Sequence, residues 1–153
     1  MEIQYRKLNE FDLDIFIRMR IKQLQEEGTM PTEDLTSPLQ SYYQRHMQDN
    51  TFVFWLAIDD GKIIATSGIS FVEKPPTYGC PSGRVGILSS MYVLGEYRRN
   101  GIATVLLDKI MREANDYSCD AVQVTGSDMG VLLYTNYGFK QNENFMHYVI
   151  DKL

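Results

Sequence analysis

The sequence predicts an α/β (α+β) fold: a mixed, mostly antiparallel central sheet of about six strands with helices on both faces. Apolar stretches of strand length recur through the 153 residues, and residues 59–62 (Asp-Asp-Gly-Lys) join two of them as a tight hairpin turn. Apolar residues at helical spacing precede and follow that hairpin. A crossover helix near residues 101–118 makes the strands on either side of it parallel. This length predicts a single domain over residues 1–153.

The composition argues against several classes of protein. A net charge of -5 and a pI near 5.0 lack the basic footprint of a general nucleic-acid binder, so no nucleic-acid partner is expected. No apolar run has the length of a membrane span, and residues 1–11 lack the apolar core of a signal peptide. Cytoplasmic location without membrane attachment is the default expectation. Cys80 and Cys119 lie far apart in the sequence and belong to no ligand pattern, so no metal is expected.

The first third of the chain predicts one strand and two helices. Residues 3–8 alternate as a strand, and Asn9 can cap the helix that follows. Apolar residues at i, i+3, i+4, i+8 and i+11 from Leu13 form one helical stripe, which Gly28 ends. A second helix is predicted to begin with Ser37 as its cap and a proline in its first turn.

Strands dominate the centre and the end of the chain. Residues 51–58, 63–72 and 84–94 are predicted strands, and Gly68 in the second of them marks a bulge or a close approach. A stripe beginning at Ala103 predicts a strong helix. The remaining expected elements are a strand at 120–125, a short helix from a cap at Ser127 to Tyr137, and a final strand at 144–151.

The turn at residues 98–103 (Arg-Arg-Asn-Gly-Ile-Ala) lies where a strand meets a helix. Unpaired N–H groups, the helix dipole, two arginines and a glycine at that point suit a pyrophosphate. The plainer reading is an arginine-rich turn that only faces solvent. A P-loop and a dinucleotide-binding glycine motif are both absent from the sequence.

This turn resembles the [QR]-x-x-G-x-[GA] signature of the GNAT superfamily of acyl-CoA-dependent N-acyltransferases. Residues 133–139 (Leu-Tyr-Thr-Asn-Tyr-Gly-Phe) are similar to the family's L-Y-x-x-x-G-F segment, and the order of elements also matches. The resemblance implies a GNAT-like sheet with a splayed parallel strand pair. It implies an N-acetyltransferase that uses acetyl-CoA as co-substrate and transfers the acetyl group to a primary amine by direct attack in a ternary complex.

The resemblance also implies site residues. Tyr134 matches the family tyrosine near the coenzyme sulfur and would be the general acid; a modestly lowered pKa would ease its proton transfer. Ser127 stands where many members have an asparagine that contacts pantetheine. The implied cofactor-binding residues are Met91, Tyr92, Val93, Arg98, Arg99, Asn100, Gly101, Ile102, Ala103, Thr104 and Ser127.

Several questions stay open at this stage. The general base could be Glu73, Glu96, Asp128 or a water molecule. The acceptor is a small-molecule or peptide amine, and the first two helices and the loop at 73–83 should shape its site. A non-catalytic acyl-CoA-binding or regulatory domain on the same scaffold is the alternative function, and a protein-interaction domain is a third. The sequence permits a homodimer and a monomer equally.

Overall fold

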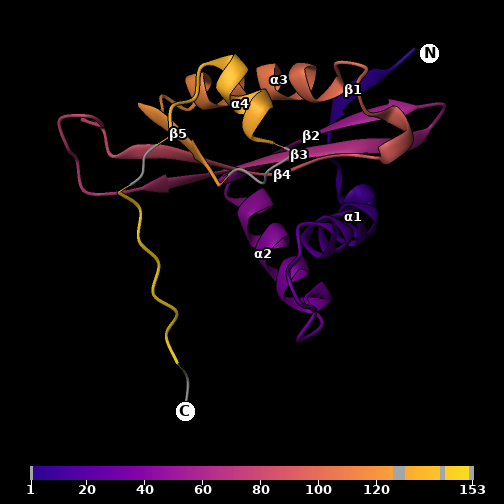
Figure 1. The fold of residues 1–153 in the computed structure, drawn as a ribbon, viewed down its shortest axis with the longest axis horizontal. Helices are drawn as coiled ribbons and strands as arrows, with labels where there is room; N and C mark the ends of the chain where they lie inside the picture. Colours follow the sequence, from indigo (N-terminus) through magenta and orange to yellow (C-terminus); the bar gives the residue numbers. More distant parts are fainter. Residues whose placement is uncertain (1, 126–129, 142–143, 152–153) are drawn as a thin grey trace.

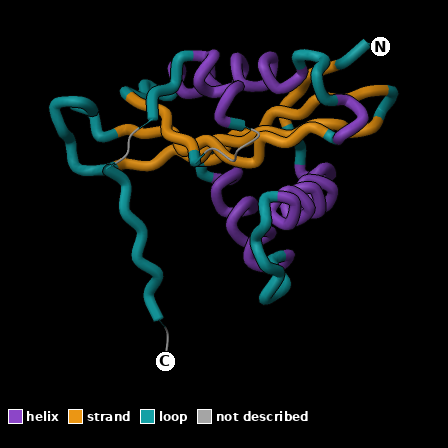
Figure 2. The backbone as a smooth tube through the Cα atoms, viewed as in Figure 1, coloured by secondary structure: helices purple, strands orange, loops and turns teal. Residues whose placement is uncertain are grey.

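A computed structural model describes residues 2–125, 130–141 and 144–151. The sheet in these residues has the strand order β1-β2-β3-β4-β5 (Figures 1 and 2). The first three pairs are antiparallel and β4–β5 is parallel, which confirms the predicted mixed sheet. The strands are β1 (Gln4–Lys7), β2 (Phe52–Asp59), β3 (Lys62–Glu73), β4 (Arg84–Val93) and β5 (Ala121–Val124).

Helices cover both faces of the sheet, as predicted. In Figure 1, α1 (Leu13–Glu26) and α2 (Thr36–Gln48) lie below the sheet, whereas α3 (Ile102–Asp116) and α4 (Val131–Tyr137) lie above it. Two short 3-10 turns, η1 (Glu10–Asp12) and η2 (Gly95–Tyr97), lead into α1 and the turn before α3. The chain therefore forms three layers, and the central strands are buried on both sides.

Each face of the sheet has its own core. Below it, Phe16 of α1 packs edge-on against Phe54 of β2, with ring centroids 4.6 Å apart, and against Tyr43 of α2 at 5.2 Å. Above it, Leu107 and Ile110 of α3 are fully buried. Burial on both faces explains why β2 is a continuous apolar run and does not alternate.

Local sequence patterns correctly predicted the β2–β3 hairpin and the special position of Gly68. Asp60 and Gly61 both have positive φ (48° and 78°) in the β2–β3 hairpin, as a type I′ turn requires. Gly68 marks both predicted features: the β3–β4 register shifts beside it, and a Cβ there would lie 2.6 Å from the Phe52 ring. The predicted cap of α2 was wrong, because the helix begins at Thr36, whose N–H donates to the Asp34 carboxylate at 2.9 Å.

The parallel pair separates along its length. β5 pairs with β4 over Val85–Leu88 only, and β4 continues to Val93 without a partner on that side in the described residues. This opening confirms the splayed pair that the family resemblance implied, and it lies directly before the turn at 98–103.

The final strand expected at residues 144–151 was wrong, and the described sheet has five strands. The segment has no regular secondary structure, and Figure 1 shows it running away from the body of the molecule. Its apolar alternation favours a strand, but a strand forms only where an edge lies beside it to accept its hydrogen bonds. The path of this chain brings no such edge alongside.

Candidate functional site

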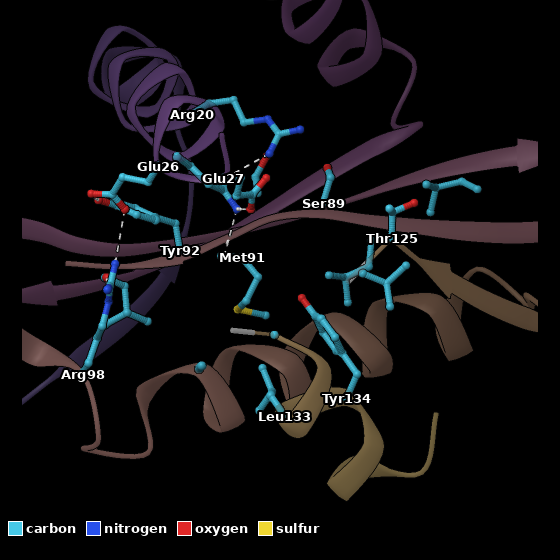
Figure 3. Close-up of a pocket in the computed structure, with 18 residues that line it drawn as sticks. Arg20, Glu26, Glu27, Ser89, Met91, Tyr92, Arg98, Thr125, Leu133 and Tyr134 are labelled. Atoms are coloured by element: carbon cyan, nitrogen blue, oxygen red, sulfur yellow. Dashed lines mark hydrogen bonds and ion pairs between the residues drawn. The ribbon is translucent and has the colours of Figure 1, made fainter. Parts of the chain in front are cut away.

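A cavity of about 480 Å³ opens at the splayed part of the sheet (Figure 3). One wall is the C-terminal half of α1, the opposite wall is α4 with the start of α3, and the second half of β4 and the end of β5 lie between them. The residues that line this cavity include Arg20, Gln23, Glu26, Glu27, Met91, Arg98 and Tyr134.

A bulge shapes the part of β4 that lines the cavity. Ser90 and Met91 together face the single residue Ser67 of β3, and Ser90 adopts φ 59°. The Thr66 hydroxyl holds the bulge by donating to the Ser90 carbonyl at 2.8 Å. The Met91 carbonyl accepts from Gln23 Nε2 at 3.0 Å. Since N–H and C=O of one residue in an extended strand point to the same side, the Met91 N–H also faces the α1 side of β4.

The turn at 98–103 has the backbone geometry of an anion site. Arg99 and Gly101 both have positive φ, 66° and 76°. Asn100 fixes the turn, because its Nδ2 donates to the carbonyls of Tyr97 and Arg98 at 3.0 and 3.1 Å. The first intrahelical bond of α3 is donated by Val105, so the three preceding N–H groups, at 102–104, point from the helix start. Such a concave set of N–H groups at the positive end of a helix suits a diphosphate.

Arg98 folds back towards α1. Its Nε donates to the Val93 carbonyl at 2.9 Å, and its guanidinium lies 3.4 Å from a Glu26 carboxylate oxygen (Figure 3). The Tyr92 hydroxyl donates to the other oxygen of Glu26 at 2.9 Å, and the guanidinium lies 5.7 Å from the centre of the Tyr92 ring. Arg98 therefore ties the turn at 98–103 to α1, and a phosphate that took its side chain would compete with Glu26.

Tyr134 reaches the cavity from the opposite wall. Its side chain is 8% exposed, and Figure 3 shows its hydroxyl pointing from α4 towards β4. Burial, and second the negative charge of Glu27, raise the pKa of Tyr134 to about 12. The pKa moves upwards, opposite to the lowered value that would ease proton release, so the hydroxyl stays protonated throughout the physiological range. Because the charge of Glu27 contributes to this raised pKa, the Glu27 carboxylate lies within electrostatic reach of Tyr134 across the cavity.

The α1 carboxylates were missed from the sequence. Glu26 and Glu27 stand at the end of α1, whose last turn has no basic residue. Carboxylates are unfavourable beside the negative end of a helix dipole. A pair of them at the predicted end of this helix could therefore have been recognised in the sequence as a candidate functional feature. Gln23 links them to the rest of the wall: its Nε2 donates to Glu27 at 3.2 Å, and its Oε1 accepts from Arg20 at 3.1 Å.

The expected site residues divide into two groups. Met91, Tyr92, Val93, Arg98, Ala103 and Tyr134 line the cavity. Arg99, Asn100, Gly101, Ile102 and Thr104 belong to the turn or the first turn of α3, and the Ile102 side chain is buried in the core, which leaves only its backbone for a ligand.

Two of the bases considered from sequence, Glu73 and Glu96, do not line the cavity. Glu73 ends β3 opposite Arg84, and Glu96 pairs with Lys62 at 3.9 Å. Ser127 and Asp128 lie outside the described residues. The tyrosines of α2 (Tyr42 and Tyr43) and of the loop at 73–83 (Tyr78) do not line the cavity, so among the described elements expected to shape the acceptor site only α1 does. Across residues 2–125, 130–141 and 144–151, no cluster of His, Cys, Asp and Glu has the geometry to hold a metal ion.

The model of the Acetyltransferase (GNAT) family matches residues 19–139. The chain belongs to the GNAT acetyltransferase family. Residues 19–139 include the C-terminal half of α1, the splayed strands, the turn and Tyr134, so the GNAT match covers every wall of the cavity.

Individual GNAT relatives agree with the family match. N-acetyltransferase 8 of Rattus norvegicus is 35% identical over 106 residues, which are 66% of this chain and 46% of that protein, so the match spans about half the rat protein's length. A predicted acetyltransferase of Clostridium acetobutylicum, crystallised with acetyl-CoA, is 32% identical with a TM-score of 0.93, covering 97% of this chain and 96% of that one.

A more distant structure shows the same GNAT fold. AAC(6')-Iy in complex with a bisubstrate analogue, CoA-S-monomethyl-acetylneamine, has a TM-score of 0.79 at 21% identity, covering 99% of this chain and all of that one (100%). Family membership and the acetyl-CoA complex support acetyl transfer with acetyl-CoA as the co-substrate. In the part of the GNAT chain that the structure describes, no helix is both long and apolar enough to cross a membrane.

Proposed function

We propose that this protein transfers the acetyl group of acetyl-CoA to a primary amine by direct attack in a ternary complex. One observation supports the proposal: the turn at 98–103, a protonated tyrosine and a carboxylate meet in one cavity at the end of β4, which has no partner on its β5 side in the described residues. Each part has a separate task in the transfer. The acceptor is a small-molecule or peptide amine.

The cofactor lies along the splayed strands in this proposal. The N–H groups of Ile102, Ala103 and Thr104, with Gly101 at the cap, hold the coenzyme A pyrophosphate. Gly101 suits this task because it accepts φ 76° without strain and presents no side chain to the phosphates. The pantetheine arm follows β4 past Leu88, where β5 no longer pairs with it, and brings the thioester towards Tyr134.

The acceptor amine approaches from the α1 wall. A primary alkylamine is protonated at neutral pH, since its pKa is about 10.4, and it must lose a proton before it can attack. Glu27 is the group that takes this proton, directly or through one water, because it lines the cavity opposite Tyr134. It takes the place of Glu73 and Glu96, which do not line the cavity, whereas Asp128 lies outside the described residues.

The transfer then proceeds with balanced charges. The amine nitrogen forms a bond to the thioester carbon, and N–H groups of the bulged strand near Met91 and Val93 stabilise the oxyanion. The carbon–sulfur bond breaks, and the departing thiolate accepts a proton from Tyr134. The nitrogen, which carries a positive charge after the attack, loses its extra proton to the tyrosinate through water, so that the amide, the free thiol and a protonated Tyr134 result. With a pKa of about 12 against about 8.5 for a thiol, complete transfer costs roughly 5 kcal/mol. Protonation of Glu27 lowers that cost, because it removes the negative charge that helps to raise the tyrosine pKa.

The alternative is a non-catalytic acyl-CoA-binding or regulatory domain on the same scaffold. Such a domain needs the turn at 98–103 but neither Tyr134 nor Glu27. The experiment that separates the two is thiol release from acetyl-CoA with a panel of acceptors: an aliphatic polyamine, an aminoglycoside and a peptide with a free N-terminus. We expect release with at least one class. Binding of acetyl-CoA without release for any amine would favour the regulatory reading.

A further inference from the structure

We propose that the acceptor carries a carboxylate as well as its amine, and that Arg20 binds this carboxylate while the amine lies beside Glu27. The acceptor is thus a compound in which both groups lie close together, as in a short amino acid or an acidic peptide N-terminus. This inference rests on the proposed acetyl transfer and adds the class of substrate. It comes from two opposite charges in the cavity that no described residue neutralises.

Four charged side chains line the cavity in the described residues, and two of them already pair with each other. The Arg98 guanidinium lies 3.4 Å from the Glu26 carboxylate, which also accepts from the Tyr92 hydroxyl. Across the described residues, Arg20 and Glu27 form no ion pair. One cation and one anion are therefore left for a ligand, and a molecule that carries both charges complements them.

The side chain of Gln23 sets the distance between these two charges. Its Oε1 accepts from Arg20 Nη1 at 3.1 Å, and its Nε2 donates to Glu27 Oε1 at 3.2 Å. One amide group spans the remaining distance, so the Arg20 and Glu27 atoms lie at most about 9 Å apart. Because the two charges do not contact each other, a ligand can reach both. Their spacing limits it to a short chain between nitrogen and carboxylate.

The part of the cavity beside Arg20 offers hydrogen-bond donors to a carboxylate. A guanidinium has five N–H donors in a planar fork that fits a carboxylate, and one of them is taken by Gln23. Ser90, which is 2% exposed, also lines the cavity, and its hydroxyl has no hydrogen-bond partner in the described residues. A buried hydroxyl is costly unless a ligand or a water molecule pairs with it.

Arg20 and Ser90 lie on the same side of the cavity, because both act on Tyr43 of α2. Burial raises the pKa of Tyr43, whereas the Ser90 hydroxyl and the positive charge of Arg20 oppose that rise. Arg20 is itself half-buried, and Figure 3 shows the Ser89 hydroxyl facing the α1 wall. A charge in such surroundings is less screened by water, so a carboxylate interacts with it more strongly than at the open surface.

The same charges argue against acceptors that carry only positive charge. A polyamine or an aminoglycoside that placed one ammonium beside Glu27 would bring a second one near Arg20. Like charges at that distance repel each other, and the repulsion disfavours such ligands. A carboxylate in the same position turns this repulsion into attraction.

Two matched pairs of acceptors test the carboxylate by titration calorimetry in the presence of coenzyme A. 4-Aminobutyrate is compared with butylamine, and the peptide amide Ala-Asp-NH2 with Ala-Asn-NH2. We expect the acid member of at least one pair to bind about 10- to 100-fold more tightly. A preference in the first pair identifies a free amino acid, and a preference in the second pair alone identifies an acidic peptide N-terminus. Equal, weaker or undetectable binding of both acid members would overturn the proposal.

Substitutions of Arg20 test whether this residue causes the preference. Arg20→Met should weaken binding of the acid member about 10- to 100-fold and binding of the neutral member by less than about twofold. Arg20→Lys should restore part of the preference. Arg18→Met is the matched control and should keep it in full, because Arg18 is exposed on the same helix and does not line the cavity. An equal loss for both members in Arg20→Met would show that Arg20 only positions Gln23, and would contradict the proposal.

Thiol release from acetyl-CoA with the same acceptors separates this inference from the proposed function. The binding preference decides the carboxylate site, and thiol release decides acetyl transfer. Preferred binding of an acid member without thiol release would retain the carboxylate site and contradict acetyl transfer. Thiol release with butylamine, together with equal binding within both pairs, would retain acetyl transfer and overturn the carboxylate site.

Discussion

The two walls of the cavity are built in different ways. The wall at the turn and α3 acts through its backbone: positive φ at Arg99 and Gly101 and free N–H groups at a helix start. The wall at α1 acts through side chains, which Gln23 holds together by hydrogen bonds. A backbone site needs few residue types at fixed spacing, whereas a side-chain site can be composed in many ways. In the proposed reaction, the cofactor and the acceptor are thus bound by different kinds of structure.

The largest effect should come from the backbone wall. Gly101→Glu places a side chain and a negative charge in the turn at φ 76°, and we expect loss of acetyl-CoA binding. In thermal unfolding, acetyl-CoA at about 100 times its Kd stabilises the wild type by about 2.7 kcal/mol, and the variant should show no such shift. Gly61→Glu is the control, since Gly61 has φ 78° in the β2–β3 hairpin and does not line the cavity. An equal loss of the shift in both variants would mean that strain, not the turn, is responsible.

The side-chain wall should govern turnover without governing cofactor binding. Glu27→Gln removes the base, so we expect kcat to fall by about 10²–10⁴-fold while the acetyl-CoA melting shift persists. The deficit should shrink as pH approaches the amine pKa of about 10.4, where the acceptor deprotonates without help. Glu73→Gln, at the far end of β3, should keep the wild-type rate. A deficit that is independent of pH would assign Glu27 to substrate binding only.

Tyr134 depends on both walls of the cavity. Its position is set by α4, whereas its pKa is raised in part by Glu27 at the end of α1. Tyr134→Phe should retain the acetyl-CoA shift and lower kcat by roughly 10²-fold. Because the tyrosine pKa is about 12, the wild-type rate should show no loss from tyrosine ionisation between pH 7 and 10. Equal kcat for the two proteins across pH 7–9 would remove the general-acid role.

The smallest effect is on stability at high pH. The pKa of Tyr134 is about 12 in the folded protein and about 10 when unfolded, so its contribution is complete below pH 10 and is lost as pH rises towards 12. Between pH 10 and 11 the free energy of unfolding of the wild type should fall by about 1 kcal/mol more than that of Tyr134→Phe. Urea unfolding of both proteins at these two pH values measures the difference. Identical slopes would show that the hydroxyl is solvated in the folded state.

Sequence reasoning succeeded where a local rule decides the structure. Asp60 and Gly61 specify a hairpin, Gly68 marks a close approach, and the turn before α3 follows from residue types within six positions. It failed where distant parts decide. Whether 144–151 becomes a strand depends on an edge that the single chain does not present. Glu27 becomes part of the site only because α1 packs across the opening of β4.

The hydrogen bond between Gln23 and the Met91 carbonyl has a consequence for how the proposed activity could diversify. This bond fixes the position of α1 along β4. Residues three and four positions from Gln23, such as Arg20 and Glu27, therefore face the cavity together with it. Substitutions on this stripe of α1 can change the charge and shape of the side chains that would contact an amine, while the fold and the turn at 98–103 are retained. We therefore expect that a few substitutions on this single helix can change which amine is acetylated.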